Sequence, residues 1–239
     1  MINIHRRQLI GAAGAAALMP AAAAIAAPAA PAPTKGGKTA LNADQALALL
    51  KEGNRRFVAD QPATGPISRK RRLEIAKSQA PFAVLVSCSD SRVGPEQLFG
   101  RGLGELFIVR NAGNTASANE AMGSIEYAVA VLGAPLVVVL GHERCGAVAA
   151  ATEVVEKNTN FPGSIGRMVE PIIPAALRSR GMPGDWVDNA VRANVRRTVE
   201  QLRTAVEPIL LEPQKQGRLK VVGAYYDLDT GAVEWLDGA

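Results

Sequence analysis

Three residues that can bind a soft metal ion lie in two short patterns of the sequence. Cys88 opens the pattern CSDSR, and the pattern GHERCGA contains His142 and Cys145. They are the only cysteines and one of the two histidines, and the other histidine, His5, lies near the amino terminus. Two thiolates and one imidazole leave a tetrahedral zinc ion one ligand short, as in catalytic rather than structural zinc sites. The ligand types therefore predict a catalytic metal centre.

Two other interpretations of the cysteines stay open at this point. Cys88 and Cys145 could be ordinary buried residues, or they could form a disulfide, which an exported protein permits. Buried cysteines alone would not explain a histidine three residues before Cys145. Cys145 also lies at the expected start of a helix, where the backbone N–H groups and the helix dipole favour a thiolate.

Each pattern follows an apolar run that is typical of a buried strand, residues 82–86 in one case and 135–140 in the other. Residues 106–109 and 219–226 predict two more such strands, and unbroken apolar runs are typical of parallel sheets covered on both faces. The carboxyl ends of adjacent parallel strands share one edge of a sheet, where open α/β folds place their active sites. The two patterns are therefore expected to meet.

Helical periodicity separates these strands. Asn42 is an expected N-cap with Gln45 three residues later, and it opens a helix that continues to about Val58. The other expected helices cover residues 69–77, 116–132, 144–156, 164–176 and 185–206. The turn at Asp229 to Gly231 predicts an antiparallel edge strand over 232–236. The fold class is thus α/β, with a mainly parallel β-sheet core, flanking helices and a C-terminal antiparallel edge strand.

The composition fits one globular domain with a small appendage. The chain has 239 residues, of which 21% are charged and 4% are aromatic. The sequence has no phosphate-binding loop of the GxGxxG or GxxxxGK[ST] type, which argues against a nucleotide enzyme. The basic cluster at residues 69–72 lacks interleaved aromatic residues, so we interpret it as a solvated helix face and expect no nucleic-acid partner.

The amino terminus has the layout of an export signal. Arg6 and Arg7 precede an alanine-dominated run with small-residue cleavage sites such as Ala27-Pro28-Ala29. Paired arginines indicate twin-arginine export, and hence a periplasmic or otherwise exported protein that folds and loads metal before export. A retained anchor is the alternative, but alanine is weakly apolar and prolines interrupt the run, so we expect no membrane span in the mature form.

The predicted domain boundary falls near residue 40. Residues 1–40 are interpreted as the export signal and a flexible leader that includes residues 31–38, and residues 41–239 as the catalytic domain. Removing the first 32 residues takes away two of the 27 basic residues and none of the 22 acidic ones, which leaves a net charge of +3. The mature protein is expected to be only mildly basic.

Four sequence segments together give the chain a specific resemblance to a known family. CSDSRV, LFIVRNAGN, SIEYAV and GHERCGA resemble the β-class carbonic anhydrases, and the similarity extends from about Asn42 to the carboxyl terminus. The resemblance implies Cys88, His142 and Cys145 as ligands of one Zn²⁺ per chain. Asp90 and Arg92 would otherwise be interpreted as a simple ion pair. The resemblance makes them a gating pair, in which the bidentate arginine keeps the carboxylate away from the metal.

The resemblance also implies a substrate pocket for CO2 and bicarbonate. Gln79 occupies the position of the amide donor to the substrate, Phe107 and Tyr127 match the apolar walls, and Gly113 matches a backbone segment packed against the site. Taken singly, Gln79 would be interpreted as a polar helix-end residue and the two aromatic residues as core. The family further implies a homodimer or a higher homo-oligomer with pocket residues shared across the interface. Leu85 departs from the bicarbonate-inhibited branch, which has tryptophan at this position.

The expected activity is the zinc-dependent reversible hydration of CO2 to bicarbonate and a proton. Zinc lowers the pKa of a bound water towards neutrality and so supplies the nucleophile. Two alternatives keep the same metal ligands: hydrolysis of a CO2 isostere such as COS or CS2, and a zinc-binding protein without turnover. A storage site would be expected to have a closed shell of four protein ligands, in which Asp90 and Arg92 would have no role.

Overall fold

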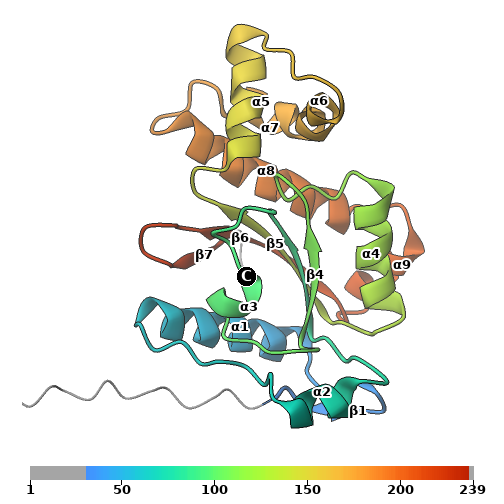
Figure 1. Ribbon diagram of the computed structural model, residues 1–239. Helices are drawn as coiled ribbons and strands as arrows, with labels where there is room; N and C mark the ends of the chain where they lie inside the picture. The colour runs from blue at the N-terminus through green and yellow to red at the C-terminus, as the bar shows by residue number, and fades with distance from the viewer. Residues whose placement is uncertain (1–30, 237–239) are drawn as a thin grey trace, which may run out of the picture.

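A five-stranded β-sheet with the order β4-β3-β5-β6-β7 runs through residues 31–236, the part of the chain that the computed structural model describes (Figure 1). The strands are β3 (Ala83–Ser87), β4 (Leu106–Arg110), β5 (Leu136–His142), β6 (Lys220–Tyr226) and β7 (Val233–Leu236). Strands β4, β3, β5 and β6 are parallel, and β7 pairs antiparallel with β6. The structure confirms the predicted α/β fold and its antiparallel C-terminal strand.

Helices cover both faces of the sheet (Figure 1). α1 and α3 pack on one face, and α4, α5, α7, α8 and α9 contribute to the core on the other. Within β3, Val84 and Val86 face the layer that contains α8, and Leu85 faces the layer that contains α1. Burial on both faces explains the unbroken apolar runs of the central strands. The helices are α1 (Ala43–Val58), α2 (Arg69–Ile75), α3 (Pro95–Leu98), α4 (Asn119–Ala130), α5 (Gly146–Lys157), α6 (Ser164–Val169), α7 (Ile173–Ser179), α8 (Trp186–Arg203) and α9 (Pro208–Lys215), with the 3-10 turn η1 (Glu170–Ile172).

α1 begins at the predicted cap and is fastened to the last hairpin. The Asn42 side chain accepts from the Gln45 N–H, and the Gln45 side chain accepts from the Asn42 N–H, which completes the capping box. Further along α1, buried Asn54 donates to the Gly231 carbonyl and accepts from the Val233 N–H, both at 2.9 Å. α1 is therefore fixed against the sheet by packing and by a buried side-chain amide.

The single helix expected over 164–176 is wrong. The structure divides this segment into α6, η1 and α7, with a proline at the start of both η1 and α7. Pro171 and Pro174 lack the N–H that an uninterrupted helix needs, and their rings clash with the preceding turn. The apolar periodicity of the segment survives because successive short turns still bury Val169, Ile172 and Ala176.

The helix expected over 185–206 ends earlier than its apolar pattern. α8 ends at Arg203, and Val206, which the pattern placed on the buried stripe, is 90% exposed. Two short helices, α3 and α9, were not predicted. α3 has 4 residues, and α9 begins with a proline and contains another, so neither shows a clear helical period.

The residues just before α1, where a flexible leader was expected, form a small hairpin. β1 (Thr34–Lys35) and β2 (Lys38–Thr39) pair antiparallel. The Ala32 N–H donates to the buried carboxylate of Glu105 at 2.7 Å, which ties this segment to the domain. Most of the predicted export signal lies in residues 1–30, outside the described residues. Within residues 31–236, no helix combines the length and apolar character that a membrane span requires.

Candidate metal centre

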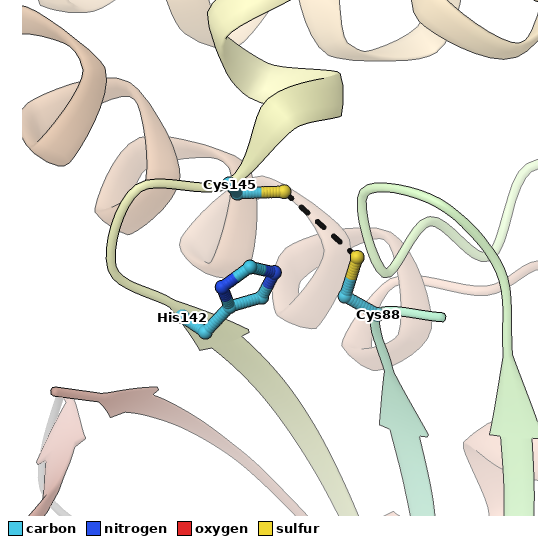
Figure 2. A group of neighbouring side chains, drawn as sticks. All are labelled: Cys88, His142 and Cys145. Atoms are coloured by element: carbon cyan, nitrogen blue, oxygen red, sulfur yellow. Dashed lines mark hydrogen bonds between the residues drawn. The ribbon is translucent and has the colours of Figure 1, made fainter. Parts of the chain in front are cut away.

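The structure brings the three predicted metal ligands together at one edge of the sheet. Cys88 directly follows β3, His142 is the last residue of β5, and Cys145 is the N-cap of α5. β3 and β5 are parallel neighbours with Ser87 opposite Leu140, so both strands deliver their next residues to the same place. Figure 2 shows the three side chains pointing towards one another. Their ligand atoms all lie within 4.8 Å of one another, and all three residues are buried.

The two sulfur atoms have the separation of metal ligands. Cys88 Sγ and Cys145 Sγ lie 3.9 Å apart, and both cysteines are free. A disulfide would require about 2.0 Å between the sulfurs. Two thiolates bound to one tetrahedral zinc at about 2.3 Å each are expected to lie about 3.8 Å apart. The thiols therefore fit a shared metal ion, and the disulfide interpretation is wrong for this structure.

The imidazole of His142 is oriented as a metal ligand. The side chain is completely buried, and Nδ1 lies 2.9 Å from the backbone carbonyl of Glu143. Because a carbonyl can only accept, Nδ1 carries the hydrogen and Nε2 has the lone pair. Nε2 is buried and has no hydrogen-bond partner among the described residues. A carbonyl that fixes the tautomer of a histidine in this way is typical of metal sites.

The protonation of the two thiols is coupled. The hydrogen bond from Cys145 lowers the pKa of Cys88, and the Gly113 N–H lowers it further against the effect of burial. The same sulfur contact and burial raise the pKa of Cys145, while backbone N–H groups of Val148 and Ala147 at the start of α5 oppose this. The pair thus readily holds one negative charge, and the second charge requires a cation nearby. A divalent metal ion meets this requirement, so the donor set fits zinc.

Asp90 lies at the rim of this cluster in a bidentate ion pair with Arg92. Arg92 Nε donates to Asp90 Oδ1 at 2.9 Å, and Arg92 Nη2 donates to Asp90 Oδ2 at 2.8 Å. These bonds, with the Arg92 backbone N–H, hold the pKa of Asp90 well below its usual range. Asp90 Oδ2 is 3.9 Å from His142 Nε2. The carboxylate is therefore ionised, close to the cluster and held by the guanidinium.

Arg110 is a part of the site that the sequence did not single out. Its Nε donates to the Cys88 carbonyl at 2.8 Å, and its Nη2 donates to the Asp90 carbonyl at 2.6 Å. It thereby fixes the backbone between the first metal ligand and the carboxylate. Its position at a strand end could have indicated this role, because Arg110 ends β4 directly opposite Ser87 at the end of β3.

Gly113 lies against the cluster, and its predicted role at the substrate pocket stays a prediction. Its N–H donates to Cys88 Sγ at 3.4 Å, and its φ is +85°. A side chain is disfavoured at this backbone angle, and a Cβ here would come within 2.4 Å of Ile172 Cδ1. The glycine therefore allows the backbone to approach the sulfur.

The other three predicted pocket residues do not meet the cluster within one chain. Gln79 is exposed and precedes the amino end of β3, whereas Cys88 follows its carboxyl end. Phe107 pairs with Val84, four residues before Cys88, which corresponds to about 13 Å along the strand. Tyr127, on α4, is 48% exposed and packs on Phe107 with ring centroids 6.3 Å apart. Their role in substrate binding stays a prediction.

The fold and the site define an α/β protein with a buried Cys2His cluster that could hold a metal ion at the carboxyl ends of parallel strands. The sequence model of the carbonic anhydrase family matches residues 83–233, from the start of β3 to β7. The chain belongs to the β-class carbonic anhydrases, and this confirms the family that the motifs indicated.

Relatives match most of the chain. A carbonic anhydrase of Mycolicibacterium smegmatis is 41% identical over 185 residues, 77% of this chain and 89% of the relative. Carbonic anhydrase 2 of Mycobacterium tuberculosis is 42% identical over 182 residues, 76% of this chain and 87% of the relative. Among solved structures, a Coccomyxa β-carbonic anhydrase in complex with acetazolamide has a TM-score of 0.59 and 29% identity, covering 80% of this chain and 86% of its own. A tetrameric β-carbonic anhydrase of Sordaria macrospora has a TM-score of 0.62 and 26% identity, covering 70% and 85%.

Proposed function

We propose that this protein catalyses the reversible hydration of CO2 to bicarbonate and a proton with one zinc ion per chain. The observation that carries the proposal is the buried triangle of Cys88, His142 and Cys145, with the lone pair of His142 Nε2 left without a hydrogen-bond partner in residues 31–236. Its position at the strand ends of a carbonic anhydrase fold supports a catalytic role. Three protein ligands leave room for a reacting molecule, which a storage site has no reason to provide.

The residues of the site divide into ligands and positioning groups. Cys88, His142 and Cys145 would hold the zinc, which acts as a Lewis acid and lowers the pKa of water when bound. Arg92 keeps the Asp90 carboxylate ionised and paired at the rim, so that the carboxylate does not complete the ligand set. Asp90 can then accept a hydrogen bond from the water that attacks CO2 and orient it.

The substrate pocket is proposed to form between two copies of the chain. Gln79 and Tyr127 are exposed, and with Phe107 they lie towards the opposite end of the sheet from the cluster of their own chain. A homodimer or higher homo-oligomer would allow one copy to place these residues beside the ligands of the other. The similarity to the tetrameric Sordaria enzyme supports such an assembly.

We also propose that the protein is exported through its paired arginines. Arg6 and Arg7 with the following alanine-rich run support this proposal. Cell fractionation of the full chain tests it, with Arg6→Lys/Arg7→Lys as the matched variant that keeps the charge. Export is expected to be lost in the variant, and equal export of both proteins would contradict the twin-arginine route.

Stopped-flow measurement of the pH change on mixing with CO2 tests the activity, together with the zinc content of the same sample. Zinc-loaded protein is expected to accelerate hydration, and protein stripped with a chelator is expected to lose this activity and regain it with zinc. Tight zinc without CO2 hydration would indicate a zinc-binding protein. Turnover of COS or CS2 without CO2 hydration would assign the alternative substrate class.

A further inference from the structure

The loop after β4 brings a backbone donor to the sulfur of Cys88 in a strained conformation. Gly113 and Asn114 have φ values of +85° and +47°. Glycine adopts this region freely, but Asn114 is disfavoured there unless the surroundings hold it, although asparagine tolerates the region better than most residues. The Gly113 N–H reaches Cys88 Sγ only while the loop keeps this conformation. The hydrogen bond to Cys88 Sγ thus depends on the contacts that hold the backbone of Gly113 in place.

Contacts within the loop fix its two ends and close the turn around Gly113, where the Asn114 backbone N–H donates to the Asn111 carbonyl at 3.2 Å. The Asn111 side chain accepts from the Thr115 N–H at 2.9 Å and donates to the Thr115 carbonyl at 2.7 Å. Asn111 is also bound through its backbone to Ser87 and Ser89 beside β3. The side-chain amide of Asn114 is buried and has no partner among the described residues, so only the backbone of Asn114 contributes a hydrogen bond here.

One side chain from outside the loop holds its centre. Asn194 of α8 is 1% exposed, and its Nδ2 donates to the Gly113 carbonyl at 2.8 Å. Gly113 is therefore held on both sides, with its carbonyl on Asn194 and its N–H on Cys88. α8 is the longest helix of the described chain and packs on β5 and β6, so it provides a rigid support.

We propose that Asn194 is a positioning residue for the metal centre, acting through Gly113 on the thiolate of Cys88. A hydrogen bond to a thiolate draws electron density from the sulfur, and it also restricts where the sulfur lies. Asn194 thereby sets the donor strength and the position of one metal ligand without touching the metal. This inference rests on the proposed metal binding at Cys88, His142 and Cys145.

The test compares Asn194→Leu with the wild-type protein loaded with zinc or with cobalt(II). Leucine keeps the branched shape of asparagine, although it is larger, and removes the donor. The matched control is Asn189→Leu, which removes a similar bond on the same helix, from Asn189 Nδ2 to the Pro183 carbonyl at 3.0 Å. Should Asn194→Leu fail to fold, Asn194→Ala removes the donor without placing apolar bulk beside the loop.

Two readouts separate positioning from general stability. The dissociation constant for zinc is expected to rise about 10- to 100-fold in Asn194→Leu, as is usual for groups that support metal ligands. The thiolate-to-cobalt absorption band is expected to move to longer wavelength, because a sulfur without its N–H donor gives up electrons more easily. Asn189→Leu is expected to change neither quantity.

Three outcomes would overturn the inference. An unchanged zinc dissociation constant and cobalt band in folded Asn194→Leu would show that Gly113 needs no support from α8. Equal changes in Asn189→Leu would assign the effect to the helix as a whole. A wild-type protein that binds neither metal would overturn the proposed function and this inference with it, so the two failures are distinguishable.

Discussion

The substitution Gly113→Ala tests how closely the backbone geometry of one loop is linked to the metal centre. Gly113 has a φ of +85°, its N–H lies 3.4 Å from Cys88 Sγ, and a methyl group here would meet Ile172 Cδ1 at 2.4 Å. With alanine, the loop can keep its conformation only if the backbone is strained and the Ile172 side chain shifts. Otherwise the loop is expected to change and to move the N–H of residue 113 away from Cys88 Sγ.

The expected magnitude follows from these two contacts. An L-residue at positive φ costs roughly 1–2 kcal/mol. Moving the Ile172 side chain off its preferred rotamer costs about a further 0.5–1.5 kcal/mol. The smaller entropy of the unfolded alanine chain offsets about 0.4–1 kcal/mol. We expect the free energy of unfolding to fall by about 0.5–3 kcal/mol, which corresponds to roughly 1–12 °C in Tm for a domain of this size.

The matched control is Gly123→Ala. Gly123 lies inside α4, has no atom within 4 Å of an added Cβ and does not have a positive φ. Alanine is the better helix former, so this change is expected to raise the free energy of unfolding by about 0.5–1 kcal/mol. The same methyl group is thus expected to have opposite effects at the two positions.

Thermal unfolding of both variants at saturating zinc, followed by circular dichroism, measures these differences, and metal analysis after gel filtration measures zinc retention. Gly113→Ala is expected to melt below wild type and to retain less zinc, and Gly123→Ala to melt above it with full zinc. A Gly113→Ala protein as stable and as zinc-rich as Gly123→Ala would refute the link between the φ of Gly113 and the ligand geometry.

Four further predictions concern the chemistry of the site. Cys145→Ser is expected to abolish stoichiometric zinc, because a neutral hydroxyl replaces thiolate poorly, and one tightly held zinc per chain in the variant would contradict the ligand assignment. Arg92→Ala is expected to keep zinc but lose activity at least about tenfold, because it frees the Asp90 carboxylate to bind the metal; full zinc with undiminished CO2 hydration would argue against the gate. Leu85, fully buried where the regulated branch has tryptophan, is expected to leave bicarbonate a simple product inhibitor, which a sigmoidal inhibition curve would contradict. Since His142 is the only histidine beyond the amino-terminal segment, turnover is expected to rise with buffer concentration until another step limits it, and rates independent of buffer would point to a proton path within the protein.

The sheet and the metal ligands could be predicted from the sequence because both are encoded locally. Each central strand is buried on both faces, so its apolar run is unbroken and stands out from the amphipathic helices. Cys88 and His142 fall directly at strand ends, and parallel neighbours carry such residues to one edge of the sheet. Residue types and strand positions were thus sufficient to predict that Cys88, His142 and Cys145 cluster.

Helix ends were less predictable because they depend on competition between apolar periodicity and chain breakers. The apolar pattern over 164–176 is continuous, yet Pro171 and Pro174 divide it into three elements. Val206 fits the period of α8 but lies beyond the end of the helix in solvent. Periodicity records which residues can be buried, and backbone hydrogen bonding decides where each helix stops.

Only the tertiary structure decided what surrounds the ligands. Arg110 and Asn194 lie 22 and 106 residues from Cys88 in the sequence, and folding brings the first to the Cys88 carbonyl and the second to the loop that donates to the Cys88 sulfur. Gln79, by contrast, is close to Cys88 in sequence but is separated from it by the full length of β3. A short motif specifies the ligand atoms because their chemistry is intrinsic. Their hydrogen-bond partners depend on how distant segments pack, and local sequence does not encode that packing.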